Sequence, residues 1–74
     1  MKITILNTSG DTLITDEKIT GDRVKQMSTA EIKTEFDRMI KNGYVGVDEE
    51  THTTIRKLSK KNKNVTMLYP MVGG

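Results

Sequence analysis

The sequence predicts one small α+β domain, in which a single main helix packs on a mixed sheet of four or five strands. Short runs of alternating apolar and polar residues occur on both sides of one amphipathic segment, and such alternation is typical of strands that bury one face. The 74 residues make one domain near the small end of what folds alone. One helix covering one face of a small sheet would bury every apolar stripe.

The N-terminal part predicts a β-hairpin. Residues 1–6 alternate, with Met1, Ile3 and Ile5 on the face that we expect to be buried. Turn-forming residues follow, among which Gly10 can adopt a positive φ at little cost. Residues 12–15 then predict the second strand. Residues 16–27 are polar and poorly periodic, so we interpret them as a connection containing at most a short helical turn.

The segment after Met27 predicts the main helix. Ser28 and Glu31 have the spacing of a capping box, in which each side chain accepts a hydrogen bond from the other residue's free amide. Asn42-Gly43 predicts the end of the helix, with Gly43 in the left-handed conformation. The apolar residues between them recur at helical spacing and predict one buried stripe: Ile32, Phe36, Met39 and Ile40.

Three further strands are expected after the helix. Residues 44–48 and 53–58 predict two strands joined by a polar turn, and residues 65–69 predict the last strand after a loop of lysines and asparagines. The first and last strands are the best candidates for the centre of the sheet, where they would lie parallel.

Composition excludes several kinds of chemistry. The chain has no cysteine, which excludes disulfides, thiolate metal sites and a cysteine nucleophile. His52 is the only histidine, so we expect no metal site. No apolar stretch is long enough to span a membrane, and no signal peptide precedes the first strand. We therefore expect a soluble, cytoplasmic protein.

No catalytic constellation is found in the sequence. The carboxylate pairs Asp16-Glu17 and Glu49-Glu50 are sequence neighbours, and neighbours on a strand or turn point apart, which does not suit general acid–base catalysis. A basic run could contact a nucleic-acid backbone, but no aromatic residue is interleaved to stack bases. We therefore favour a solvated loop for this run, which comprises Arg56, Lys57, Lys60, Lys61 and Lys63.

The last ten residues carry the most specific motif. They read Val65-Thr-Met-Leu-Tyr-Pro-Met-Val-Gly-Gly74, in which Pro70 cannot donate to a strand ladder and marks where pairing stops. This ending, placed directly after a final strand, resembles the β-grasp (ubiquitin-like) fold. It looks most like the small prokaryotic sulfur carriers of molybdopterin and thiamine biosynthesis and the archaeal ubiquitin-like modifiers.

The resemblance implies a carrier and not an enzyme. In such proteins a partner adenylates the C-terminal glycine with ATP, and the product becomes a thiocarboxylate or a protein conjugate. It divides this chain into a β-grasp domain, residues 1–70, and a flexible tail, residues 71–74. Gly73 and Gly74 would form the acyl-carrying end, since glycine passes through narrow channels and adopts φ/ψ values closed to other residues. Extended, residues 71–74 would span about 13–14 Å.

Docking of the activating enzyme is expected beside the tail. If Val65, Met67 and Tyr69 face the helix, Leu68 projects onto the open face, where Leu6 could join it. The alternative is that Leu68 is an isolated surface leucine without a role. The expected docking residues are Leu68, Pro70, Met71 and Val72. A sulfur acceptor or a conjugation target would be the further partner, and no cofactor is expected to be bound.

Three functions therefore stay open. The tyrosine–proline ending favours a sulfur carrier over a conjugated modifier, and the tail lacks the arginine that ubiquitin has. The second function is a small β-grasp interaction module without C-terminal chemistry, for which the two glycines would be a terminus without a role. The third is a basic nucleic-acid-binding domain.

Overall fold

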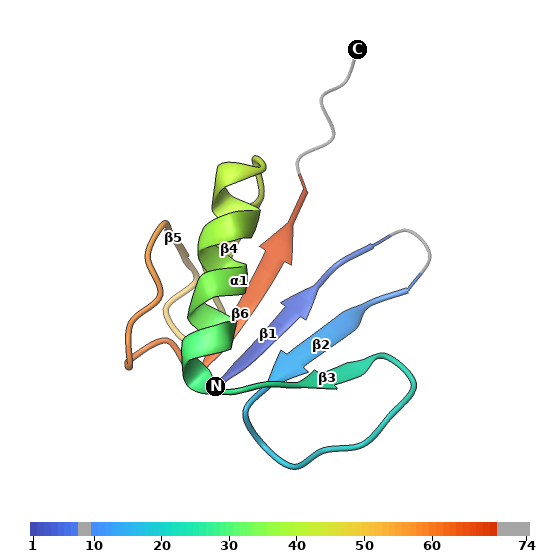
Figure 1. Ribbon diagram of the computed structural model, residues 1–74. Helices are drawn as coiled ribbons and strands as arrows, with labels where there is room; N and C mark the ends of the chain where they lie inside the picture. Colours follow the sequence, from blue (N-terminus) through green and yellow to red (C-terminus); the bar gives the residue numbers. More distant parts are fainter. Residues whose placement is uncertain (8–9, 70–74) are drawn as a thin grey trace.

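The computed structural model describes residues 1–7 and 10–69, and shows one helix beside a six-stranded mixed sheet (Figure 1). The elements in chain order are β1 (Lys2–Ile5), β2 (Thr12–Thr15), β3 (Val24–Gln26), α1 (Thr29–Lys41), β4 (Val45–Asp48), β5 (Thr53–Ile55) and β6 (Asn64–Leu68). The α+β class is confirmed. The strand count is not, because the sequence predicted four or five strands.

The first and last strands lie at the centre of the sheet, as the sequence predicted. The strand order is β3-β2-β1-β6-β4-β5. Strand β1 pairs in parallel with β6 and antiparallel with β2, while β4 pairs antiparallel with both β6 and β5. Because β1 and β6 run in the same direction, their C-terminal ends lie at the same end of the sheet, as their arrows show in Figure 1.

The interpretation of residues 16–27 as a connection was wrong for residues 24–26, while residues 16–23 do connect β2 to the next element. Val24–Gln26 form β3, which pairs in parallel with β2 at the edge of the sheet. The amide of Leu13 donates to the carbonyl of Arg23, and the amide of Met27 donates to the carbonyl of Thr15. Periodicity could not reveal this strand, because it has three residues, of which two are polar and exposed.

The predicted helix is present with its predicted cap. The Ser28 hydroxyl accepts a bond of 3.2 Å from the amide of Glu31, whose carboxylate accepts one of 3.2 Å from the amide of Ser28. The helix ends at Lys41, and Gly43 has a φ of 92°. These local signals therefore define both ends of α1.

Replacing Ser28 with alanine is expected to destabilise the protein by about 1 kcal/mol, because an alanine cannot satisfy the amide of Glu31. Urea unfolding followed by circular dichroism measures this loss. Ser28→Asp is the matched control, since aspartate is an equally good cap. Equal losses for both variants would contradict the capping role.

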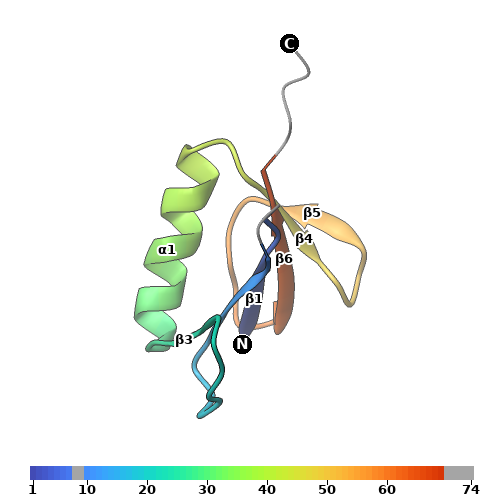
Figure 2. The same ribbon diagram turned by 90° about the vertical axis from the view of Figure 1, so that its right-hand side faces the viewer.

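The helix covers one face of the sheet and leaves the other without a helix (Figure 2). Ile32, Phe36 and Met39 of α1 are buried, and Ile40 is partly buried. From the sheet and loops, the core is completed by Ile3, Ile14, Leu58, Val65 and Met67. The strand expected over residues 53–58 is shorter, because β5 ends at Ile55. Leu58 lies beyond that end but is still buried in the core.

A glycine in β4 makes room for the largest core side chain. A Cβ atom on Gly46 would lie 2.9 Å from Cε2 of Phe36 and 3.2 Å from the carbonyl oxygen of Ile55. Real Cβ atoms do not approach that closely, so any side chain at position 46 would displace the ring. The Phe36 ring thus packs directly on the backbone of β4.

Candidate functional site: an apolar row at the end of β6

Three apolar side chains lie next to one another on the face of the sheet opposite the helix. Leu68 of β6 is directly opposite Val45 of β4. On the other side of β6, Ile5 is opposite Met67, and the amide of the next residue, Leu6, donates to the carbonyl of Met67 at 3.0 Å. Leu6, Leu68 and Val45, which we call the apolar row, therefore cross three neighbouring strands.

These side chains are accessible. The exposed fractions are 39% for Leu6, 39% for Leu68 and 37% for Val45, and Tyr69 beside them is 59% exposed. Within residues 1–7 and 10–69, these four are the exposed large hydrophobic residues. Single exposed apolar residues are normal on a surface, whereas a contiguous group is typical of an interaction site.

Tyr69 extends the group around the end of β6. Its ring lies 5.0 Å from the ring of Tyr44 in a tilted arrangement, and such pairs are favourable. The amide of Tyr44 donates to the carbonyl of Met39 at the end of α1. The ring of Tyr69 therefore packs against Tyr44, which lies in the connection between α1 and β4.

The sequence located part of this site. Leu68 is exposed while Val65 and Met67 are buried, as the alternation predicted, and Leu6 lies beside it. Tyr69, expected on the same face as Val65 and Met67, is instead 59% exposed, because it lies beyond the end of β6. Val45 was missed, since its place depends on the pairing of β4 with β6. The docking role of Leu68 stays a prediction. The other expected site residues, Pro70, Met71, Val72, Gly73 and Gly74, lie outside the described residues, as does the expected tail.

The opposite end of the sheet is held by a buried carboxylate. Asp48 accepts a bond of 2.6 Å from the side-chain amide of Asn62 and bonds of 2.8 and 3.1 Å from the backbone amides of Glu50 and Thr51. These bonds, that from Asn62 above all, hold the pKa of Asp48 below its ordinary value. Asn62 in turn accepts from Ser59, so one network ties the β4–β5 turn to the loop before β6.

Acid is expected to weaken the fold through Asp48. Because its pKa is lower in the folded protein than in the unfolded chain, ionised Asp48 contributes stability above about pH 4, and this contribution is lost as the pH falls further. The midpoint of urea unfolding should therefore drop between pH 5 and pH 2, and Asp48→Asn should reduce that drop. The exposed Asp37→Asn is the control, and an Asp48→Asn curve that parallels the wild-type curve would contradict the assignment.

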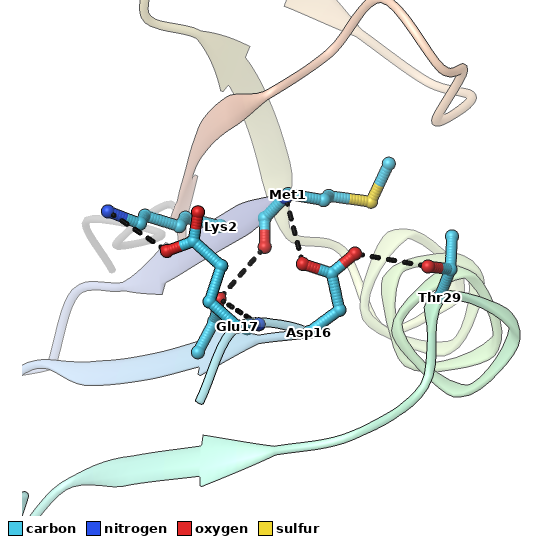
Figure 3. Close-up of polar contacts among 6 residues, drawn as sticks. Met1, Lys2, Asp16, Glu17 and Thr29 are labelled. Carbon is cyan, nitrogen blue, oxygen red and sulfur yellow. Dashed lines mark hydrogen bonds and ion pairs between the residues drawn. The ribbon is translucent and has the colours of Figure 1, made fainter. Parts of the chain in front are cut away.

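A second polar cluster surrounds the first residue (Figure 3). The Met1 amine lies 3.0 Å from one carboxylate oxygen of Asp16, and the Thr29 hydroxyl donates to the other at 3.0 Å. These bonds, that to the amine above all, lower the pKa of Asp16. Glu17 instead pairs with Lys2 at 3.4 Å. The two neighbouring carboxylates therefore hold different cations and do not converge on one point.

A hollow of the described part of the chain lies beside this cluster, away from the apolar row. Its volume is about 530 Å³, and its lining includes Met1, Lys2, Asp16 and Glu17. These charged groups already pair with one another. Size alone therefore does not make this hollow a site.

The other candidate residues lie in exposed loops and turns. The basic residues between Arg56 and Lys63 are exposed, while Leu58 and Asn62 between them are buried and fix the loop. His52 is exposed in the β4–β5 turn, with a φ of 57°. Among the described residues, no three His, Cys, Asp or Glu side chains are grouped as metal ligands would be. Over the same residues, no helix has the length and apolar character needed to cross a bilayer.

The chain was compared with protein-family models, with curated proteins and with solved structures, and none of them matches it.

Proposed function

We propose that this chain is a ubiquitin-like carrier or modifier with a β-grasp fold, whose Gly74 carboxylate is activated by a separate ATP-dependent enzyme. The observation that carries the proposal is the apolar row, Leu6, Leu68 and Val45, at the edge of the sheet where β6 ends. An enzyme that docks there would contact the chain just before residues 70–74. The sequence of those residues, with its proline and its two final glycines, suits delivery of a carboxylate to a narrow site.

The arrangement of strands supports the β-grasp assignment. The first and last strands form a parallel central pair, β1 belongs to a hairpin with β2, and α1 follows as the helix that covers one face. Strand β3 adds an edge strand beside β2. This arrangement places the C-terminal end of the central strand β6 at one end of the sheet.

The proposed activation needs no catalytic residue of this chain. One carboxylate oxygen of Gly74 attacks the α-phosphorus of ATP, the bond to the bridging oxygen of the β-phosphate breaks, and pyrophosphate leaves. The resulting mixed anhydride is a good electrophile, which the free carboxylate is not. Binding energy from the apolar row would hold the tail in place during this step.

Two fates of the acyl adenylate are compatible with the proposal. Hydrosulfide can attack the carbonyl carbon, so that AMP leaves and a thiocarboxylate forms. Alternatively, an amine of a target protein attacks, loses a proton and forms an amide as AMP leaves. The Tyr69-Pro70 ending, which resembles that of the molybdopterin-type carriers, favours the thiocarboxylate.

Intact mass spectrometry tests the proposal. The full chain is incubated with ATP, sulfide and the purified adenylating enzyme encoded in the same genome. We expect a gain equal to the mass difference between sulfur and oxygen, and a chain that ends at Val72 is the control, which should remain unchanged. Protein adducts that require Gly74 would assign the chain as a modifier. An unchanged full chain would contradict the proposal.

The interaction module without C-terminal chemistry is the alternative, because an exposed apolar row serves any binding protein. It predicts that removal of Gly73 and Gly74 leaves binding of a partner unchanged. In the carrier, binding would survive only in part, because the tail adds contacts in the enzyme's active site. Comparing the affinities of the full and shortened chains separates the two functions.

A further inference from the structure

A groove opens beside the apolar row. It has a volume of about 350 Å³ and lies where the connection after α1 meets the β4–β5 pair. Val45 belongs both to this groove, which also reaches Ile40 of α1, and to the apolar row, so the groove and the row meet at Val45. The groove lining is Ile40, Gly43, Tyr44, Val45, Thr54, Ile55 and Arg56.

Arg56 is the charged residue of that lining. It directly follows Ile55, which is opposite Gly46 in the β4–β5 pair, and its side chain is exposed. No ion pair or side-chain hydrogen bond joins it to the described part of the chain. By contrast, Arg38 at the same end of α1 already makes two hydrogen bonds to Glu35. Within residues 1–7 and 10–69, Arg56 therefore presents an unpaired guanidinium beside an apolar surface.

A partner that covers the apolar row and the groove would remove water from this guanidinium. Burial of an unpaired charge is costly, and the cost is offset only when the other surface supplies an opposite charge in good geometry. The planar guanidinium favours a carboxylate, with which it can form two parallel hydrogen bonds. A partner that buries this guanidinium therefore needs an acidic residue opposite Arg56.

We propose that the activating enzyme recognises this chain through a carboxylate that pairs with Arg56, next to an aliphatic side chain that enters the groove beside Val45. The inference rests on the proposed function and adds the chemistry of the docking surface to it. Arg56 is thus a specificity determinant, and an enzyme without the matching acidic residue would not accept this chain well.

Steady-state ATP–pyrophosphate exchange, with the full chain as the varied substrate and the adenylating enzyme from the same genome, tests the inference. Arg56→Glu should raise the KM for the chain about tenfold or more, because like charges would then face each other across the interface. The KM for Arg56→Lys should lie between the wild-type value and that for Arg56→Glu, because lysine keeps the charge but loses the bidentate geometry. The matched control is Lys57→Glu, an exposed neighbour outside the groove, for which we expect a change below about threefold.

The outcomes separate the two levels of the proposal. A large effect of Arg56→Glu alone, with an unchanged melting temperature, supports the pairing. Wild-type exchange with no effect at Arg56, or with equal effects at Arg56 and Lys57, overturns the pairing while the carrier function stands. Absence of exchange with the wild-type chain contradicts the carrier function, and the pairing with it.

Discussion

Replacing Phe36 with alanine is expected to lower the free energy of unfolding by about 3–5 kcal/mol. Phe36 is fully buried, and its ring fills the space that Gly46 leaves open on β4. The loss combines the transfer energy of the ring with the cavity left behind, because the strands beneath it cannot collapse onto the helix. A domain of 74 residues has a total stability of about 4–11 kcal/mol. This single change could therefore unfold a large part of the population.

Chemical denaturation monitored by circular dichroism measures this effect. Lys33→Ala is the matched control, since Lys33 is exposed on the same helix and its truncation should change stability by about 0.5 kcal/mol or less. If Phe36→Ala cost no more than Lys33→Ala, the ring would not be the core side chain that the packing indicates.

If the proposed activating enzyme docks on the apolar row, replacing Leu68 with serine is expected to raise its KM for this chain roughly 30-fold or more. Loss of a central interface anchor typically costs 2 kcal/mol or more, and each 1.4 kcal/mol is a factor of ten. Leu68 occupies the middle of the apolar row, between Leu6 and Val45. Since it is exposed, its replacement should leave the melting temperature nearly unchanged.

Val24→Ser is the matched control for this variant. Val24 lies on β3, on the far side of β2 from the apolar row, and is also partly accessible. Its replacement should leave the KM near the wild-type value. Equal KM values for the Leu68 and Val24 variants would show that the apolar row is not the docking surface.

Features of this fold that depend on neighbours in sequence could be predicted well. The Ser28–Glu31 capping box and the Gly43 stop define α1, because the partners of each signal are three or four residues apart. The parallel central pair was also predictable, since β1 and β6 have the clearest alternation. The helix stripe and the buried faces of these two strands then account for most of the core.

Features that depend on pairing across the sheet could not be predicted. Strand β3 is held by backbone bonds to β2, which leave no mark on its polar sequence. Val45 joins the apolar row only through its register with Leu68. Asp48, at the end of β4, and Asn62, in the loop before β6, are polar residues, and their burial follows from a bond between residues fourteen positions apart.

The sequence therefore predicted Leu68 and Leu6 of the candidate site but missed Val45 of β4. The groove with Arg56 was not predictable, because it forms where α1, β4 and β5 meet. In the sequence Arg56 stands at the start of a basic run, from which nothing distinguishes it. Its position beside Val45, and the absence of a partner among the described residues, give it a separate role in the proposal.

The central claim is that the fold presents the Gly74 carboxylate to an enzyme that docks on the apolar row. ATP–pyrophosphate exchange catalysed by the adenylating enzyme of the same genome, with the full chain and with a chain that ends at Val72, tests it most directly. The account predicts exchange that depends on the full chain and disappears with the shortened one. Equal exchange with both chains, or none with either, would contradict it.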